Sequence, residues 1–263
     1  MNSPYLIFTS SGQYSNHKEW LPGKQFDLWI YDYQDTESDY HLDADFYDRR
    51  AGGKFSNLLH AYKAQPKRFE SYEYIMVADD DIEISGDQLN KCFQITKEYN
   101  LWVSQPAFMI DGKISHHQTR VKILPLLRYS NFVEMTCPIF QTQKLLSFLE
   151  VYDDTLMGHG IDWWFIEHIK APPKKIAIID QTPCRNPLDL KKGNQREIDK
   201  LQDMPTRVQT WQKLKDKHNL SFDEVKVDAT GTVYTMESIL KGIFSFNLIF
   251  LKYKEKLQKM LKV

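Results

Sequence analysis

The fold is decided by residues 72–83, which read YEYIMVADDDIE. The first part, Tyr72–Ala78, is short, nearly all apolar and rich in β-branched or aromatic residues. That composition is typical of a strand buried on both faces of a parallel sheet. Three aspartates follow at once, and an isolated buried carboxylate is very costly. We therefore expect them at the carboxyl end of the strand, where open α/β sheets bind their ligands.

The three aspartates also predict a metal site. In an extended segment Asp79 and Asp81 project to one side and Asp80 projects to the other. Two carboxylates on one side attract a hard divalent cation. Such a cation usually recruits phosphate oxygens to complete its coordination shell, so the same pattern predicts a phosphate-bearing ligand.

The segments around this stretch alternate between strand-like and helix-like patterns. Together they predict an α/β fold with a Rossmann-like, mixed and mostly parallel sheet flanked by helices. The acidic stretch Asp35–Asp48 has no clear period and predicts a long surface loop. The other expected strands are Tyr5–Thr9, Phe26–Tyr33, Leu101–Ser104, Asn131–Phe140 and Lys174–Asp180. The expected helices are Phe55–Ala64, a segment from Ser85 to Tyr99, Gln141–Tyr152, the run after Asp162, and Gly193–Asn219 docked by Trp211 and Leu214.

The composition of the 263 residues suits one large domain or a domain with an appendage. We expect a domain over residues 1–220 and a helical appendage over 221–263. The net charge of −1 argues against general nucleic-acid binding. The three cysteines are odd in number and widely spaced, which favours a reducing cytoplasm over a disulfide framework. No secretory signal pattern and no run of 18 apolar residues is seen.

Three positions have the chemistry to contact a phosphate-bearing ligand. Ser10 begins a loop at the end of the first expected strand, although a plain polar turn also explains it. Gly52 and Gly53 precede a helix, so backbone amides and the charge of Lys54 can approach a phosphate. Alternatively the glycines only form a turn and Lys54 is solvated. The guanidinium of Arg185 matches phosphate geometry, and an ordinary surface arginine is an equal alternative.

Acidic and histidine residues in the second half add candidates. Glu134 lies inside an expected strand, and a charged residue there needs a partner or a function. Asp162 begins an expected helix, where it serves either as a cap or as a functional group. There the helix dipole would lower its pKa. His159 sits between two glycines and either contacts substrate or fills space. His116, followed by His117, is expected in a surface loop, with substrate contact as the alternative.

Four pieces of the chain, in this order, carry a resemblance to a known family. They are Gly52–Phe55 (GGKF), Tyr72–Ile82, Phe132–Phe140 (FVEMTCPIF) and Gly158–Asp162 (GHGID). A strand followed by Asp-x-Asp resembles the nucleotide-sugar motif of glycosyltransferases with the GT-A fold. The wider pattern resembles the DUF707 group of plant and bacterial glycosyltransferases, over residues 50–190.

The resemblance implies a transfer of sugar from a nucleoside-diphosphate donor to a hydroxyl of a glycan or lipid-linked glycan, such as a bacterial surface polysaccharide. Asp162 would be the general base if the reaction inverts. Asp81 would hold Mn²⁺ or Mg²⁺, with Asp79 on the metal or the ribose. Relatives tend to supply a histidine near Cys184, and its absence here puts the third metal ligand in doubt. The remaining implied contacts are Ser10, Lys54, Asp80 and Arg185 to the donor, and Glu134 and His159 to the acceptor.

The C-terminal segment predicts either membrane contact or packing. A dense apolar run over Ile239–Leu251 precedes five lysines, from Lys252 to Lys262. This run is too short to span a bilayer and suits a helix lying on the inner face of an anionic membrane. The alternative is a helix packed against the domain or a second subunit.

Three rival functions share some of these features, and the first fits the sequence poorly. A phosphatase with an aspartyl nucleophile usually carries its Asp-x-Asp motif on the first strand, with threonine or valine after it. Here the motif follows a later strand and Ile82 comes next. A nucleotidyltransferase on a related fold is harder to separate. An inactive GT-A-like scaffold bound to a membrane is the third.

Overall fold

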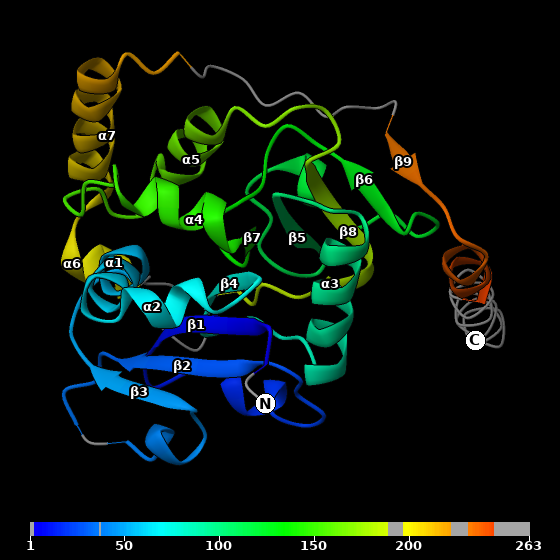
Figure 1. The fold of residues 1–263 in the computed structure, drawn as a ribbon, viewed down its shortest axis with the longest axis horizontal. Helices are drawn as coiled ribbons and strands as arrows, with labels where there is room; N and C mark the ends of the chain where they lie inside the picture. The colour runs from blue at the N-terminus through cyan, green and yellow to red at the C-terminus, as the bar shows by residue number, and fades with distance from the viewer. Residues whose placement is uncertain (1–2, 37, 189–196, 222–230, 245–263) are drawn as a thin grey trace, which may run out of the picture.

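The computed structural model describes residues 3–36, 38–188, 197–221 and 231–244. These residues form a mixed α/β fold around a sheet of nine described strands, in the order β3-β2-β1-β4-β7-β5-β8-β6-β9 (Figure 1). The strands are β1 Tyr5–Ser11, β2 Asp27–Asp32, β3 Phe46–Arg49, β4 Tyr74–Asp79, β5 Val103–Phe108, β6 Leu127–Tyr129, β7 Ile139–Gln141, β8 Ile176–Cys184 and β9 Thr232–Val233. The named helices are α1 Lys54–Ala64, α2 Pro66–Glu70, α3 Gly86–Glu98, α4 Thr142–Leu149, α5 Ile161–Ile169, α6 Glu197–Leu201 and α7 Met204–His218. Short 3-10 turns lie at η1 His17–Trp20, η2 Tyr40–Leu42 and η3 His117–Thr119.

The predicted central strand is confirmed as β4, and it is buried on both faces. Ile75 and Val77 pack in one core with side chains of α1, α4, α5 and α7. Met76, which points the other way, packs in a second core with side chains of α3. This alternation follows from the two-residue period of a strand. Helices therefore cover both faces of the sheet, which explains why the strand is apolar almost throughout.

The sheet topology creates a crevice beside β1. Strands β1, β2, β3 and β4 are all parallel, and β1 pairs with β2 on one side and β4 on the other. The chain therefore reverses its direction of winding between β1 and β4. In open α/β sheets, ligands bind outside the carboxyl ends of the strands at this switch point. Ser10 and Asp79 are register partners at those ends.

Local sequence signals explain where two of the helices begin. Ser85 caps α3, and its side chain and that of Gln88 form a reciprocal capping box. The side chain of Asp203 accepts a hydrogen bond of 2.8 Å from Thr206 N at the start of α7. As predicted, Trp211 and Leu214 of α7 are buried against the domain.

Two predicted segments were wrong. Residues 131–138 are a loop, and only Ile139–Gln141 forms a strand, β7. Phe132, Val133 and Glu134 are buried in succession, so the apolar run that suggested a strand belongs to a buried loop. The stretch Asp35–Asp48 is not one long loop, because it contains η2 and the start of β3, an edge strand with Tyr31 paired to Asp48.

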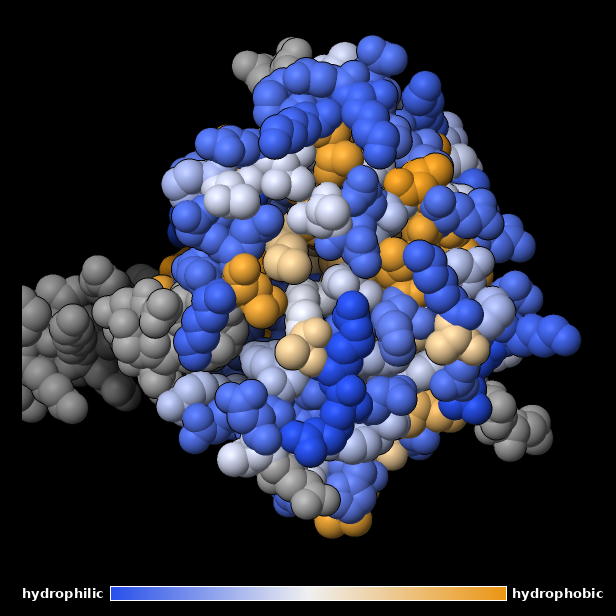
Figure 2. Space-filling model, turned by 90° about the vertical axis from the view of Figure 1, so that its left-hand side faces the viewer, coloured by the Kyte–Doolittle hydropathy of each residue, from blue (hydrophilic) through white to orange (hydrophobic). Residues whose placement is uncertain are grey.

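The C-terminal residues 231–244 begin with β9, which pairs with β6 at the sheet edge. A helix over 236–244 follows, at the opposite end of the molecule from α7 (Figure 1). The rest of the predicted apolar and lysine-rich segment, 245–263, lies outside the described residues. No helix within the described ranges is long and apolar enough to cross a membrane. On the face seen in Figure 2, hydrophilic side chains predominate and apolar groups form small separate patches.

Candidate functional site

Two cavities adjoin at the carboxyl ends of β1 and β4. The β4 cavity has a volume of about 510 Å³ and is lined by Ser10, Tyr33, Asp35, Ala51, Asp79, Asp80, Asp81, Lys113, Asn186 and others. The α5 cavity has a volume of about 410 Å³ and is lined by His116, Glu134, Tyr152, His159, Asp162, Trp163, Arg207 and others. Both cavities share Gly53, Lys54, Asp79, Ser115, Thr136 and Ile198. The two spaces thus meet around Lys54 and Asp79.

The three aspartates lie in the β4 cavity but not as an extended segment. Strand β4 ends at Asp79, and Asp80 and Asp81 form a turn. The expected strand alternation across all three residues was therefore wrong. The side chain of Asp79 is 44% exposed, whereas Asp80 and Asp81 are buried. The turn brings the three carboxylates to one cavity wall instead of two faces of a sheet.

Lys54 occupies the junction of the two cavities. Its ammonium group donates to Asp79 Oδ1 at 2.7 Å, Met135 O at 2.7 Å and Thr136 O at 3.1 Å. The lysine is the first residue of α1, after Gly53 as N-cap. The ammonium group of Lys54 therefore connects three parts of the fold, namely α1, β4 and the 131–138 loop. The solvated alternative does not hold, since the Lys54 side chain is only 12% exposed.

The residues around the turn fit a divalent cation that shares its shell with a ligand. Asp79 and Asp81 supply carboxylate oxygens, the donors that Mg²⁺ and Mn²⁺ prefer. Within the described ranges, no group of three or more His, Cys, Asp or Glu residues could hold a metal. Mg²⁺ is commonly held by one or two carboxylates plus substrate phosphates, which suits this arrangement.

Asp162 lies in the first turn of α5 and lines the α5 cavity. Its Oδ1 accepts a hydrogen bond of 3.0 Å from Trp163 N, and Gly160 is the N-cap residue. Burial is the main cause that raises the pKa of Asp162 to about 7, and the negative charge of Glu134 contributes to the rise. The expected lowering by the helix dipole was wrong, because desolvation of the carboxylate outweighs it. A carboxylate with a pKa near 7 suits a general base.

Glu134 is buried beside the same cavity. Its Oε1 accepts a hydrogen bond of 2.6 Å from Thr119 Oγ1. Burial raises the pKa of Glu134, while hydrogen bonds from Thr119, Ser115 and the His116 backbone oppose the rise. These bonds hold the 115–119 segment against the cavity, with the His116 ring 4.7 Å from that of Phe132. The predicted surface loop therefore carries a half-buried histidine that lines the α5 cavity.

Gly158, His159 and Gly160 form a tight loop that packs against α6 and α7. Both glycines have positive φ angles, +71° and +92°. A Cβ on Gly160 would lie 2.3 Å from the Trp211 ring, and one on Gly158 would lie 2.8 Å from Ile198. The glycines therefore permit close packing as well as the backbone turn. His159 lines the α5 cavity with its ring edge-on to Trp163.

Ser10 and Arg185 have different positions relative to the site. Ser10 lines the β4 cavity, and its Oγ accepts a hydrogen bond of 3.0 Å from Asn57 Nδ2. Arg185 lines neither cavity and pairs with Glu83 at 2.9 Å and Asp111 at 3.4 Å. The neighbouring Cys184 is buried, with its Sγ 3.9 Å from that of Cys137, so it faces the core.

Several cavity residues gave no local sequence signal. Trp163 reads as part of an apolar run, and Arg207 reads as one polar residue of a helix. In the fold, Arg207 is buried and pairs with Asp199 at the wall of the α5 cavity. Tyr33 and Lys113 line the β4 cavity from separate loops. Only a contact prediction between distant segments could have found them.

No family model matches the chain, and no curated protein sequence matches it. Solved structures with a similar arrangement include TarS 1–349 of S. aureus in complex with UDP, at 13% identity and a TM-score of 0.46 over 70% of this chain. TarS 1–349 in complex with UDP-GlcNAc is similar at 12% identity and a TM-score of 0.46, also over 70% of this chain. A nucleotide-diphospho-sugar transferase from Desulfovibrio desulfuricans is similar at 9% identity and a TM-score of 0.41, over 84% of this chain and all of its own.

The chain spans 59% and 57% of the two TarS chains.

Proposed function

We propose that this protein is a glycosyltransferase that uses a nucleoside-diphosphate sugar. One observation carries the proposal. The acidic turn at the switch point of the sheet lines the β4 cavity, which meets the α5 cavity around Lys54 and Asp79. The α5 cavity is lined by the carboxylate of Asp162, whose pKa is about 7. One cavity can hold the donor and the other the acceptor, with the reacting groups between them.

The donor would lie in the β4 cavity. Ser10 and Asp79 at the strand ends, together with the loop after β2, would contact the nucleoside. Asp81 would hold Mg²⁺ or Mn²⁺, which would supply positive charge to the leaving diphosphate. Lys54 would add its charge at the junction, beside Asp79. The predicted diphosphate contact by Arg185 would require its side chain to leave Glu83 and Asp111.

The acceptor would lie in the α5 cavity, among aromatic side chains and the carboxylates of Glu134 and Asp162. Asp162 would take the proton from an acceptor hydroxyl while that oxygen attacks the anomeric carbon. The bond from that carbon to the diphosphate breaks, and the nucleoside diphosphate leaves with the electron pair. Glu134 and His159 would contact the acceptor, a glycan or lipid-linked glycan.

We further propose that the enzyme works in the cytoplasm, at the inner face of an anionic membrane. The C-terminal segment supports this location. On the helix over 236–244, Met236, Leu240, Ile243 and Phe244 are exposed apolar side chains. Their spacing places them along one side of the helix. The lysines of 252–262 follow in sequence and would meet acidic headgroups.

A thermal-shift panel tests donor binding. A ligand that binds only the folded state, at a hundredfold excess over its Kd, stabilises it by about 2.7 kcal/mol. We expect UDP, GDP or another nucleoside diphosphate to raise the Tm, and to raise it further with Mn²⁺. No shift with any nucleoside diphosphate or nucleotide sugar, with or without metal, would contradict the proposal.

A further inference from the structure

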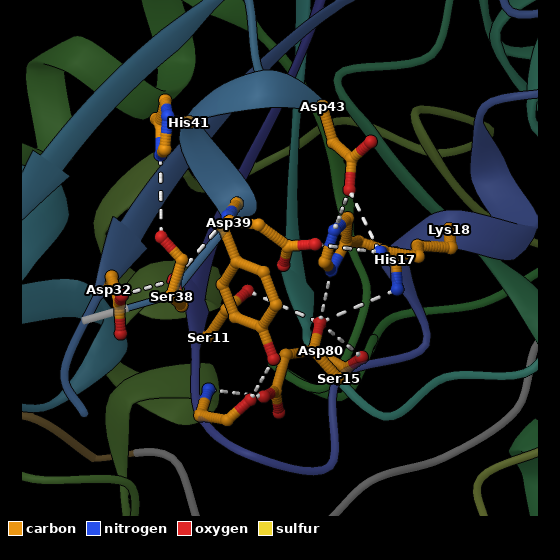
Figure 3. Close-up of polar contacts among 12 residues, drawn as sticks. Ser11, Ser15, His17, Lys18, Asp32, Ser38, Asp39, His41, Asp43 and Asp80 are labelled. Carbon is orange, nitrogen blue, oxygen red and sulfur yellow. Dashed lines mark hydrogen bonds and ion pairs between the residues drawn. The ribbon is translucent and has the colours of Figure 1, made fainter. Parts of the chain in front are cut away.

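The middle aspartate of the turn is bound by protein groups from a distant segment. Asp80 Oδ2 accepts a hydrogen bond of 2.7 Å from Gly12 N, just after β1. Gly12 O in turn accepts one of 2.7 Å from the Tyr40 hydroxyl. Figure 3 shows Asp80 within this group, surrounded by residues from the loops after β1 and β2. A hydrogen bond from a backbone amide to a carboxylate is among the stronger ones in proteins.

The segment over residues 12–20 also binds the backbone of the turn. Asn16 N donates to Asp80 O at 2.6 Å. Asn16 Nδ2 donates to Asp81 O at 2.6 Å, and Trp20 Nε1 donates to Ile82 O at 3.1 Å. Three successive carbonyl groups of the turn are thus satisfied by one segment. The carboxylate of Asp80 accepts a further hydrogen bond from the same segment, at Gly12 N, so the segment binds both the backbone and a side chain of the turn.

A buried histidine, His17, connects the same segment to the chain after β2. His17 contacts Ser15 Oγ through Nδ1 at 2.8 Å and Asp43 Oδ2 through Nε2 at 3.1 Å. Its ring lies edge-on to that of Tyr40, with the centroids 4.5 Å apart. Ser15, His17 and Asp43 have the residue types of a nucleophilic triad, but they line neither the β4 nor the α5 cavity. Their contacts brace the loops after β1 and β2 (Figure 3).

We propose that Asp80 is a positioning residue, which acts as a hydrogen-bond acceptor for Gly12 and thereby aims Asp79 and Asp81 into the β4 cavity. Asp80 then differs in role from its two neighbours, although all three have the same side chain. The link through Gly12 to Tyr40 extends this role to a residue that lines neither cavity. The proposal deepens the proposed function and rests on it for the identity of the ligand.

The test compares Asp80→Asn, Asp80→Ala and Tyr40→Phe in the full chain. An asparagine keeps an oxygen that accepts from Gly12 N, whereas alanine removes it. We expect Asp80→Ala to weaken UDP or GDP binding, measured by calorimetry, about tenfold or more, as expected for a lost hydrogen bond to a charged group. The affinity of Asp80→Asn should stay within about threefold of the wild-type affinity. A change of that size is what one ordinary, uncharged hydrogen bond contributes. Tyr40→Phe should weaken binding less than Asp80→Ala, and the double variant should be less than additive.

Three results would overturn the proposal. If Asp80→Asn binds as poorly as Asp80→Ala, the charge itself is needed and Asp80 contacts the ligand or a cation. If Asp80→Ala binds normally, the residue positions nothing. If Tyr40→Phe binds normally, or is fully additive with Asp80→Ala, the link through Gly12 carries no positioning. If Asp80→Ala does not fold, the proposal is still overturned by Asp80→Asn that binds about tenfold or more weakly than wild type, or by Tyr40→Phe that binds normally.

A second measurement separates this proposal from the proposed function. Hydrogen exchange of the Gly12 amide needs no ligand, and an amide held by Asp80 should be protected. Exchange of the Gly12 amide should accelerate in Asp80→Ala and in Tyr40→Phe. It should remain slow in Asp80→Asn. Unprotected Gly12 in the wild-type protein would overturn the positioning role. Protected Gly12 in a protein that binds no nucleotide would instead refute the proposed function alone.

Discussion

At the scale of the residue, Asp162 gives the sharpest prediction. A general base must be ionised, so kcat should rise with pH through an apparent pKa of about 7. Asp162→Asn should remove this limb and lower kcat by a factor of about 10² or more, while nucleoside-diphosphate affinity stays near wild type. A pH–rate profile of both proteins checks this. An unchanged profile in the variant would assign the titration to another group.

The raised pKa of Asp162 also predicts a stability effect. The folded state holds this proton more tightly than the unfolded state, so stability falls as pH rises from about 4 to 7. Asp162→Asn has no charge to bury, and its Tm should exceed that of wild type increasingly over this range. Thermal melts at pH 5 and pH 8 measure the difference. A lower Tm for the variant at pH 8 would mean that the carboxylate stabilises the fold.

Lys54 combines a structural and a functional role, which can be separated. Lys54→Met removes the ammonium group that donates to Asp79 Oδ1 and to three carbonyl groups. Loss of these partners should destabilise the protein by about 1–3 kcal/mol even without ligand. Urea unfolding of the apo protein gives this number. If its stability is unchanged while nucleoside-diphosphate affinity falls, Lys54 serves the ligand alone.

At the scale of the element, the packing of α5 on α7 depends on a glycine. Gly160→Ala combines a left-handed backbone with a Cβ 2.3 Å from the Trp211 ring. We expect a loss of about 2 kcal/mol or more, since strain and overpacking each cost about 1–3 kcal/mol. Gly53→Ala is the matched control, because its φ is −68° and the nearest atom is 3.9 Å away. Equal stability of the two variants in urea would contradict this account.

The elements that the sequence predicted well are those with strong local patterns. Strand β4 and helices α1, α3, α4 and α7 follow from an apolar run, a cap or a helical period. The bounds of strand β7 could not be predicted, since its three residues are defined by pairing with β4 and β5. The edge strand β3 was missed for the same reason. Strand pairing is a contact between distant segments, and it leaves little trace in a short local window.

The site was predicted in part. Placing Asp79, Asp80 and Asp81 at a strand end required only the sequence and the cost of burying charge. The ion pair of Lys54 with Asp79 and the bond of Asp80 to Gly12 join residues 25 and 68 positions apart. Neither could be predicted locally. The raised pKa of Asp162 likewise depends on surroundings that only the folded chain supplies.

At the scale of the whole molecule, two features predict membrane binding. They are the exposed apolar side of the 236–244 helix and the lysine-rich segment after it. The full chain should sediment with vesicles that contain anionic lipid, and salt should weaken this, because charges are screened over about 8 Å at physiological ionic strength. A chain ending at Phe244 should lose sedimentation and keep its Tm. Neutral vesicles are the control. Full-length protein that ignores anionic vesicles at low salt would end the membrane proposal.

The most direct test of glycosyl transfer is the product formed from a nucleotide sugar. The full chain is incubated with a panel of nucleotide sugars, Mn²⁺ and glycan acceptors, and the released nucleotides are separated and measured. The account predicts release of a nucleoside diphosphate that Asp162→Asn slows by a factor of about 10² or more. Release of pyrophosphate would indicate nucleotidyl transfer instead. No release from any donor, in a protein that is folded by thermal melting, would contradict the account.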